Sequence, residues 1–221
     1  QICSGNNLKE NIRLSKKLIL KAIKQKSDLI LTPETSSLFG LNKKQLLKIV
    51  TSMDKDIYLE CIKDLAKKYK KWILTSILVQ EKKKIKNRSI LINPEGLIQI
   101  YYDKIHMYDV ILSKKEKYLE SKIFDAGKHL KIAKLPWGKL GLSICYDIRF
   151  PNMFRRLAQK GSIFISVPSA FTETTGKKHW HTLLKARAIE NFSYIFAPAQ
   201  SGIHWNGRKT YGHSLIISPL F

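Results

Sequence analysis

The chain has 221 residues, 44% of them hydrophobic and 10% aromatic, which is enough to bury one sizeable core; we expect a single domain over residues 1–221. It carries 40 Lys and Arg against 17 Asp and Glu, a net charge of +23. The basic residues form short runs dispersed along the chain, which favours a solvated surface over a nucleic-acid interface. Nucleic acid is therefore not an expected partner, although an arrangement of these charges along one face stays open.

Three cysteines, Cys3, Cys61 and Cys145, share no metal-ligand spacing, and an odd number cannot pair fully within the chain. We therefore expect free thiols, no metal and a reducing, cytoplasmic location. No apolar run approaches the ~20 residues that cross a bilayer, and no signal-peptide pattern is present at the N-terminus, so no membrane association is expected. The chain starts at Gln1 and stops just after an apolar strand, so we expect the domain to be incomplete at both termini.

Two helix–strand units are predicted in the first part of the chain. Apolar residues recur at helical spacing over residues 8–26 and again over 57–69. Short apolar runs at 28–31 and 72–79 follow these helices and predict buried strands. Between residues 80 and 103 the period shifts to two, around a charged tip and an Asn-Pro-Glu-Gly turn, which predicts antiparallel strands.

The second half of the chain alternates strands and helices again. After an irregular stretch, apolar runs predict strands at residues 130–135, 140–144, 163–167, 194–199 and 214–218. One helix is expected to begin at Pro151, because proline is favoured in a first turn, and another to run over residues 178–191. This alternation with mostly buried strands predicts an α/β fold with mixed sheets.

Two polar residues follow predicted strands. Glu34 ends the segment Leu-Thr-Pro-Glu, where a carboxylate can face a cleft above the sheet, although a helix cap or a surface position is the commoner role for such a residue. Lys104 lies in Tyr-Tyr-Asp-Lys-Ile-His, whose aromatic residues can desolvate an ammonium and suit it to stabilise an oxyanion. The alternative for Lys104 is an ordinary lysine at a strand end.

Cys145 is the strongest local candidate, because it follows a strand and precedes a helix. Such a junction exposes a side chain and directs backbone N–H groups towards it, which favours a nucleophilic thiolate. A buried, inert cysteine is the alternative. His106 suggests a Cys-His pair, but nothing in its surrounding sequence distinguishes it from a structural histidine.

Together these segments resemble the carbon-nitrogen hydrolase (nitrilase) superfamily. Its signature is a Glu after an early strand, a Lys in a Tyr-x-Lys-x-His stretch and a Cys after a later strand, matched here by Glu34, Lys104 and Cys145 in order, spacing and local sequence. The resemblance covers essentially the whole chain. It implies an α-β-β-α four-layer sandwich, commonly a homodimer, that needs no metal or organic cofactor.

The resemblance also implies a role for each site residue. Glu34 is expected to be the general base, with a pKa tuned by burial, and Cys145 to attack the amide carbonyl. Lys104 and the backbone N–H of Tyr146 are expected to stabilise the oxyanion. Glu120 matches a second glutamate of the family, which is expected to hold Lys104 or the substrate amide.

The later loops resemble the amidase branch of the superfamily. Residues 169–176 carry this likeness, and residues 199–204 with Arg208 are similar to the deaminated glutathione amidase group. Arg149, four residues beyond the nucleophile, is expected to bind a substrate carboxylate, with an ion pair at an interface or helix start as the alternative. Phe171 and Thr175 are expected to line the acyl pocket, with ordinary loop packing as the alternative.

The sequence therefore predicts an amidase that hydrolyses the C–N bond of a small carboxylate-bearing amide. The reaction is expected to pass through a cysteine thioester and to release ammonia or an amine. An omega-amidase acting on α-keto acid amides is the neighbouring possibility. A nitrilase acting on nitriles and a catalytically silent, basic binding module on the same fold also stay open.

Overall fold

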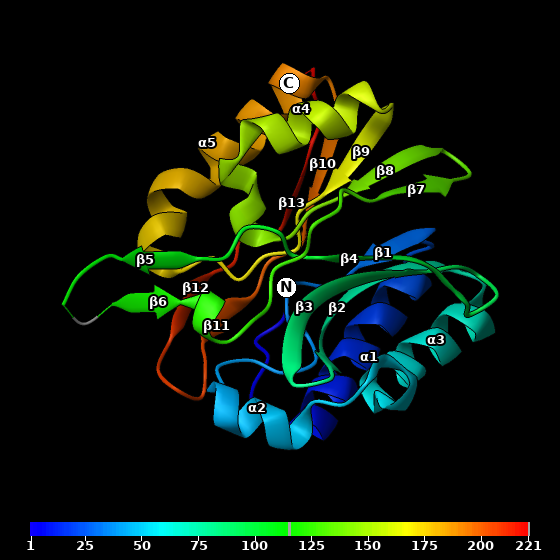
Figure 1. Cartoon of the computed structure of the whole chain (residues 1–221). Helices are drawn as coiled ribbons and strands as arrows, with labels where there is room; N and C mark the ends of the chain where they lie inside the picture. The colour runs from blue at the N-terminus through cyan, green and yellow to red at the C-terminus, as the bar shows by residue number, and fades with distance from the viewer. Residues whose placement is uncertain (115, 221) are drawn as a thin grey trace.

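The computed structural model describes residues 1–114 and 116–220. Its elements stack in four layers, helix, sheet, sheet and helix, as Figure 1 shows. Helices α1 (Leu8–Lys24) and α3 (Ile57–Tyr69) form one outer layer, and α4 (Pro151–Gln159) and α5 (Glu173–Asn191) form the other. The predicted α-β-β-α sandwich is confirmed.

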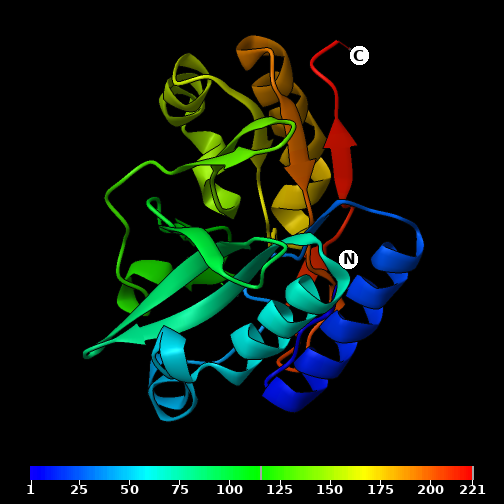
Figure 2. The same cartoon turned by 90° about the vertical axis from the view of Figure 1, so that its right-hand side faces the viewer.

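The first sheet mixes parallel and antiparallel pairing, as predicted. Its strands lie in the order β1 (Leu29–Leu31), β2 (Trp72–Glu81), β3 (Lys84–Ile92) and β4 (Ile98–Asp103). Strand β1 is parallel to β2, and the other neighbours are antiparallel. Helices α1 and α3 lie side by side beneath this sheet (Figure 2), where Ile19, Tyr58 and Ile62 are buried against it.

The second sheet is also mixed, with parallel pairing at its centre. Its strands lie in the order β13 (Leu215–Ile217), β10 (Tyr194–Ala197), β9 (Ser162–Ser166), β8 (Gly138–Leu142) and β7 (Ile132–Leu135). Helices α4 and α5 cover its outer face, and Trp180 of α5 is fully buried. Its inner face packs against Leu74 and Leu91 of the first sheet, so the main core lies between the two sheets.

Side-chain caps fix where the helices begin. Asn7 accepts hydrogen bonds from the backbone N–H groups of Lys9 and Glu10 at the start of α1. Helix α5 begins at Glu173, five residues earlier than predicted, because Thr172 caps it by accepting from the backbone N–H of Thr175. This early start brings the first turn of α5 towards the ends of the central strands.

Several short elements were not predicted. They are α2 (Lys43–Ile49), β5 (Asp109–Ile111), β6 (Lys117–Leu119), β11 (Ser201–Ile203), β12 (Lys209–Tyr211) and the 3-10 turns η1 (Met53–Lys55), η2 (Glu120–Lys122) and η3 (Cys145–Arg149). The four strands form two antiparallel hairpins, β5–β6 and β11–β12. Both hairpins lie at the same end of the sandwich (Figure 1).

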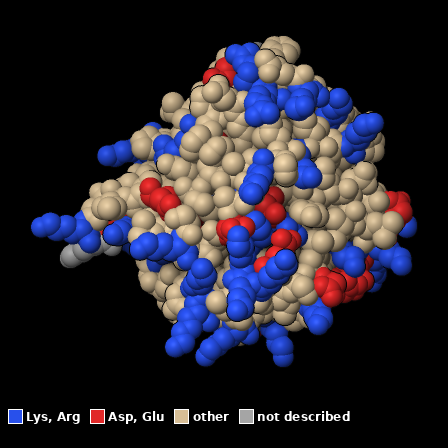
Figure 3. All heavy atoms as spheres, viewed as in Figure 1, with Lys and Arg blue, Asp and Glu red and all other residues tan. Residues whose placement is uncertain are grey.

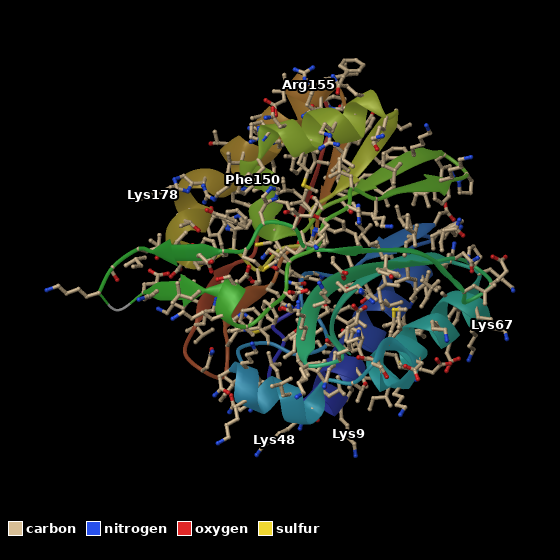
Figure 4. All side chains as sticks on the ribbon, in the orientation of Figure 1. Lys9, Lys48, Lys67, Phe150, Arg155 and Lys178 are labelled. Atoms are coloured by element: carbon tan, nitrogen blue, oxygen red, sulfur yellow. The ribbon has the colours of Figure 1, made fainter. Side chains whose placement is uncertain are left out.

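Basic side chains lie on the outer surfaces of the helices. Figure 4 shows Lys9, Lys48, Lys67, Arg155 and Lys178, one on each of the five α-helices, extending away from the body of the molecule. On the face drawn in Figure 3, basic side chains are spread around the outline with acidic ones among them. In the part of the chain that the structure describes, no helix is long and apolar enough to cross a membrane.

Candidate active site

Glu34 lies just after β1, where hydrogen bonds hold its backbone in place. The next residue, Thr35, has a φ of 51°, and its N–H donates a 3.1 Å hydrogen bond to Oγ of Ser76 on β2. The side-chain amide of Gln200 donates to the carbonyl oxygen of Glu34 itself, at 2.9 Å. Glu34 is only 2% exposed. Its position is therefore fixed by contacts with β2 and with the segment that follows β10.

Lys104, just after β4, places its ammonium between two carboxylates. Its Nζ lies 2.9 Å from Oε1 of Glu34 and 3.0 and 2.7 Å from the two carboxylate oxygens of Glu120. The side-chain amide of Asn87 donates to Oε1 of Glu34 at 2.8 Å, and the backbone N–H of Tyr108 donates to Oε2 of Glu120 at 2.8 Å. Glu120 therefore holds Lys104, which is one of the two roles expected for it; the other was to hold the substrate amide.

Cys145 begins the 3-10 turn η3, three residues after β8. It has a φ of 49°, a left-handed conformation that is strained for a residue with a side chain. A 2.9 Å hydrogen bond from its N–H to the carbonyl oxygen of Pro168 anchors this conformation. The N–H of Tyr146 lies in the first turn of η3, where backbone donors have no acceptor within the helix. Both features fit a nucleophile beside an oxyanion donor, and the Cys145 side chain itself is buried, at 7% exposed.

The charges of this cluster set the protonation states of its members. Burial and the charge of Glu34 raise the pKa of the Cys145 thiol well above its ordinary value. Burial alone would lower the pKa of Lys104, but Glu120 and Glu34 outweigh it, so that pKa is raised well above its ordinary value. The resting site therefore holds a neutral thiol and a charged ammonium.

The pKa of Glu34 is set by more than the burial that was expected to tune it. Burial does raise its pKa, but the charge of Lys104 and hydrogen bonds from Lys104, Cys145 and Asn87 outweigh burial, so its pKa lies below its ordinary value. The carboxylate is thus ionised at neutral pH and ready to accept a proton. It is, however, a weak base towards a thiol whose own pKa is raised.

A cavity of about 200 Å³ opens onto these residues. Among the predicted site residues, its lining includes Glu34, Glu120, Cys145, Tyr146, Phe171 and Thr175. The chain thus brings together, from both sheets and the start of α5, most of the residues selected from the sequence. The binding roles of Phe171 and Thr175 stay predictions.

Arg149 lies outside the lining of this cavity. Its Nη2 is 3.1 Å from Nδ1 of His179 on α5. Its guanidinium carbon lies 5.7 Å from the ring centroids of both Tyr146 and Phe171, so it packs behind two residues of the lining. Its expected contact with a substrate carboxylate stays a prediction.

His106 belongs to a structural network instead of a pair with Cys145. Its Nδ1 lies 2.7 Å from Oδ1 of Asp147, and its ring stacks on Phe150 at a centroid distance of 3.5 Å. Asp147 is fully buried and also accepts hydrogen bonds from the hydroxyl of Tyr102 at 2.7 Å and the N–H of Ile144 at 2.9 Å. This carboxylate therefore ties the Lys104 segment to the turn that carries Cys145.

Four residues of the site had no assigned role in the sequence analysis. Asn87, Tyr108 and Gln200 hold the two glutamates, and Arg208 lines the cavity. The first three act through contacts between distant segments, which no local motif reports. Among the residues that the structure describes, no group of three His, Cys, Asp or Glu could hold a metal ion.

Comparisons with known proteins agree with this geometry. Residues 1–221 match the family model described as carbon-nitrogen hydrolase. The chain is 40% identical over 228 residues to deaminated glutathione amidase of Dictyostelium discoideum, covering 99% of this chain and 78% of that protein.

Solved structures give the same result. The Caenorhabditis elegans NitFhit protein superposes with a TM-score of 0.91 at 36% identity, over 99% of this chain and 54% of that one. A nitrilase-superfamily member from Saccharomyces cerevisiae gives 0.85 at 27% identity, over 98% and 80% of the two chains. The fold, the site and these relatives together show that this chain belongs to the carbon-nitrogen hydrolase family and is an amidase that acts on C–N bonds.

Proposed function

We propose that this chain hydrolyses the amide bond of a small carboxylate-bearing substrate, with deaminated glutathione as the first candidate. The observation that carries the proposal is the Lys104 ammonium, held between Glu34 and Glu120 at a cavity that also contains the Cys145 thiol. The name of the Dictyostelium relative supports the choice of substrate.

In the first half-reaction, Cys145 attacks the amide carbonyl carbon while Glu34 takes the thiol proton. Because the pKa of the thiol is raised and that of Glu34 is lowered, the transfer is unfavourable in the empty site. We therefore propose that this proton transfer occurs at the same time as formation of the S–C bond. The Lys104 ammonium and the N–H of Tyr146 then stabilise the negative charge that develops on the carbonyl oxygen.

The first half-reaction ends when the protonated Glu34 gives its proton to the amine nitrogen as the C–N bond breaks, which leaves a thioester on Cys145. In the second half-reaction, water takes the place of the amine that has left. Glu34, ionised again, then takes a proton from water as the water oxygen attacks the thioester carbonyl. The S–C bond then breaks, Glu34 returns its proton to the Cys145 sulfur and the carboxylic acid leaves, so one amide and one water yield one acid and one amine.

Product analysis tests the choice of substrate. Hydrolysis of the amide in deaminated glutathione gives 2-oxoglutarate and cysteinylglycine, whereas an omega-amidase substrate such as α-ketoglutaramate gives ammonia. We expect cysteinylglycine to form with a higher kcat/KM than ammonia. The reverse order would favour the omega-amidase, release of ammonia from a nitrile panel would favour a nitrilase, and no product in any assay would favour the silent binding module.

The setting of the enzyme is part of the proposal. Cys3, Cys61 and Cys145 are all free thiols, which supports a reducing, cytoplasmic location. Phe192 and Ile216, with 71% and 73% of their surface exposed, are candidates for burial in a proposed homodimer. Sedimentation velocity at micromolar concentration is expected to give about twice the chain mass of 25.5 kDa, and the chain mass itself would exclude the dimer.

A further inference from the structure

The side chain of Arg208 forms part of the cavity wall. The residue precedes β12, and its Nη2 donates a 3.1 Å hydrogen bond to the carbonyl oxygen of Ala170. Its guanidinium carbon lies 4.9 Å from the ring centroid of Phe39 and 4.7 Å from that of Tyr118, which holds the group between two aromatic side chains. The guanidinium is thus fixed in place on three sides.

Arg208 nevertheless has unused hydrogen-bond donors. Its Nε is buried and has no partner among the described residues. No described carboxylate oxygen lies within 4.0 Å of its guanidinium, whereas the buried Arg88 and Arg187 each pair with a carboxylate. Arg208 is half-buried, and a partly desolvated cation without a counter-ion is costly, so such a group is normally kept for a ligand that supplies one.

The charge of the catalytic cluster makes this cation useful. With Glu34 and Glu120 ionised, Lys104 charged and Cys145 neutral, the cluster has a net charge of −1, which repels an anionic substrate. Arg208 supplies a compensating positive charge on the wall of the same cavity.

Arg208 is also linked to the nucleophile through one residue, Ala170. The backbone N–H of Ala170 interacts with the thiol of Cys145, and the carbonyl oxygen of the same residue accepts from Arg208. Arg208 and Cys145 thus contact the same residue and line the same cavity, so that one small substrate can reach both.

We propose that Arg208 binds a carboxylate of the substrate through its Nε and remaining Nη donors and so gives this site its preference for anionic amides. The identity of the amide rests on the proposed function, but binding of the anion does not. A substrate with two carboxylates would bind Arg208 through one of them. Comparing substrates that carry the carboxylate at different positions, in Arg208→Gln and in the unmodified chain, identifies which one.

Calorimetric titration of glutarate, a dicarboxylate with no amide to cleave, tests anion binding without catalysis. Removal of a charge-assisted hydrogen bond in Arg208→Gln is expected to weaken binding roughly 10- to 100-fold. The control is Lys209→Gln, which removes the same charge from an exposed neighbour and is expected to bind like the unmodified chain. Equal affinity in Arg208→Gln and Lys209→Gln would overturn the proposal.

Two amides of equal chain length separate carboxylate binding from a purely structural role. For glutaramate, which carries a carboxylate, kcat/KM is expected to fall roughly 10- to 100-fold in Arg208→Gln, and for pentanamide, which carries none, to stay unchanged. An equal fall for both would mean that Arg208 only holds the Ala170 segment, and the proposal would fail. If Arg208→Gln does not fold, Arg208→Lys gives the same comparison with a smaller loss.

The two proposals fail in different ways. An unmodified chain that cleaves neither amide would contradict the proposed function, while the glutarate titration would still decide the role of Arg208. A third comparison locates the carboxylate: α-ketoglutaramate carries one only on its acyl side, and deaminated glutathione carries a second on its leaving group. We expect a loss in Arg208→Gln with both substrates, which assigns the acyl carboxylate; a loss with deaminated glutathione alone would assign the carboxylate of the leaving group and contradict the result expected for glutaramate.

Discussion

The Nζ of Lys104 lies 2.9 Å from Oε1 of Glu34, and the two residues are only 1% and 2% exposed. Each keeps the other charged, because an opposite charge at this distance in a buried site opposes the effect of burial. Glu34 is therefore a base that stays ionised but holds a proton weakly, and substrate binding must drive the transfer from Cys145.

Glu34→Gln is expected to lower kcat by roughly 10²- to 10⁴-fold, the usual range for loss of a general base. The same change is expected to lower the pKa of the Cys145 thiol, because the charge of Glu34 helps to raise it. Alkylation of Cys145 by iodoacetamide, followed by peptide mass spectrometry across pH, measures the second effect.

Glu60→Gln is the matched control, because Glu60 is exposed and pairs with Lys63 on the surface of α3. It is expected to leave both the rate and the alkylation profile unchanged. If Glu34→Gln moved the alkylation profile to higher pH, the negative charge of Glu34 would not be the neighbour that holds the thiol neutral.

The site also predicts a pH dependence of folding stability. The folded pKa of Glu34 lies below the ordinary 4.5, so its contribution is present above pH 4.5 and lost as pH falls through the folded value. The folded pKa of Lys104 lies above the ordinary 10.5, so its contribution is present below pH 10.5 and lost as pH rises through the folded value.

Thermal unfolding checks the acid side of this dependence. The Tm of the unmodified chain minus that of Glu34→Gln is expected to stay level at neutral pH and to decrease below pH 4.5. A difference that increases on acidification would mean that folding raises the pKa of Glu34, contrary to the geometry.

Asp147→Asn is expected to lower the free energy of unfolding by about 2–4 kcal/mol, because an amide cannot accept all the hydrogen bonds that this carboxylate receives and leaves buried donors unsatisfied. Urea denaturation measures the change. Asp28→Asn is the control, since Asp28 forms an exposed pair with Lys71 and is expected to contribute less than about 1 kcal/mol. Equal effects of the two changes would remove the structural role given to Asp147.

Long amphipathic segments made much of the fold predictable. The apolar residues of α1 and α3 recur at helical spacing, and the structure buries Ile19, Ile62 and Leu65 from them. Helix α2 was missed because it has seven residues and buries only Leu46, although Asn42 and Gln45 form a capping box that a search for helix starts would find. The three-residue strands of the hairpins are too short to show the alternation of apolar and polar residues that predicts a strand.

The site was predictable only where a local motif carried it. Glu34, Lys104 and Cys145 stand in recognisable segments, and Glu120 required the family likeness. Asn87 lies inside β3, and its contact with Glu34 depends on how β1, β2 and β3 pair, which the sequence does not state. The lowered pKa of Glu34 was likewise hidden, because it depends on the distance to Lys104 and not on burial alone.

The most direct test of the account is the kcat for deaminated glutathione in Cys145→Ala, measured beside Cys61→Ala. Cys61 is a half-buried thiol on α3, away from the cavity lining, and its removal is expected to leave kcat unchanged. Loss of the nucleophile is expected to lower kcat by more than about 10³-fold. A Cys145→Ala variant that kept more than roughly a tenth of the activity would contradict the thioester mechanism and the central role given to this site.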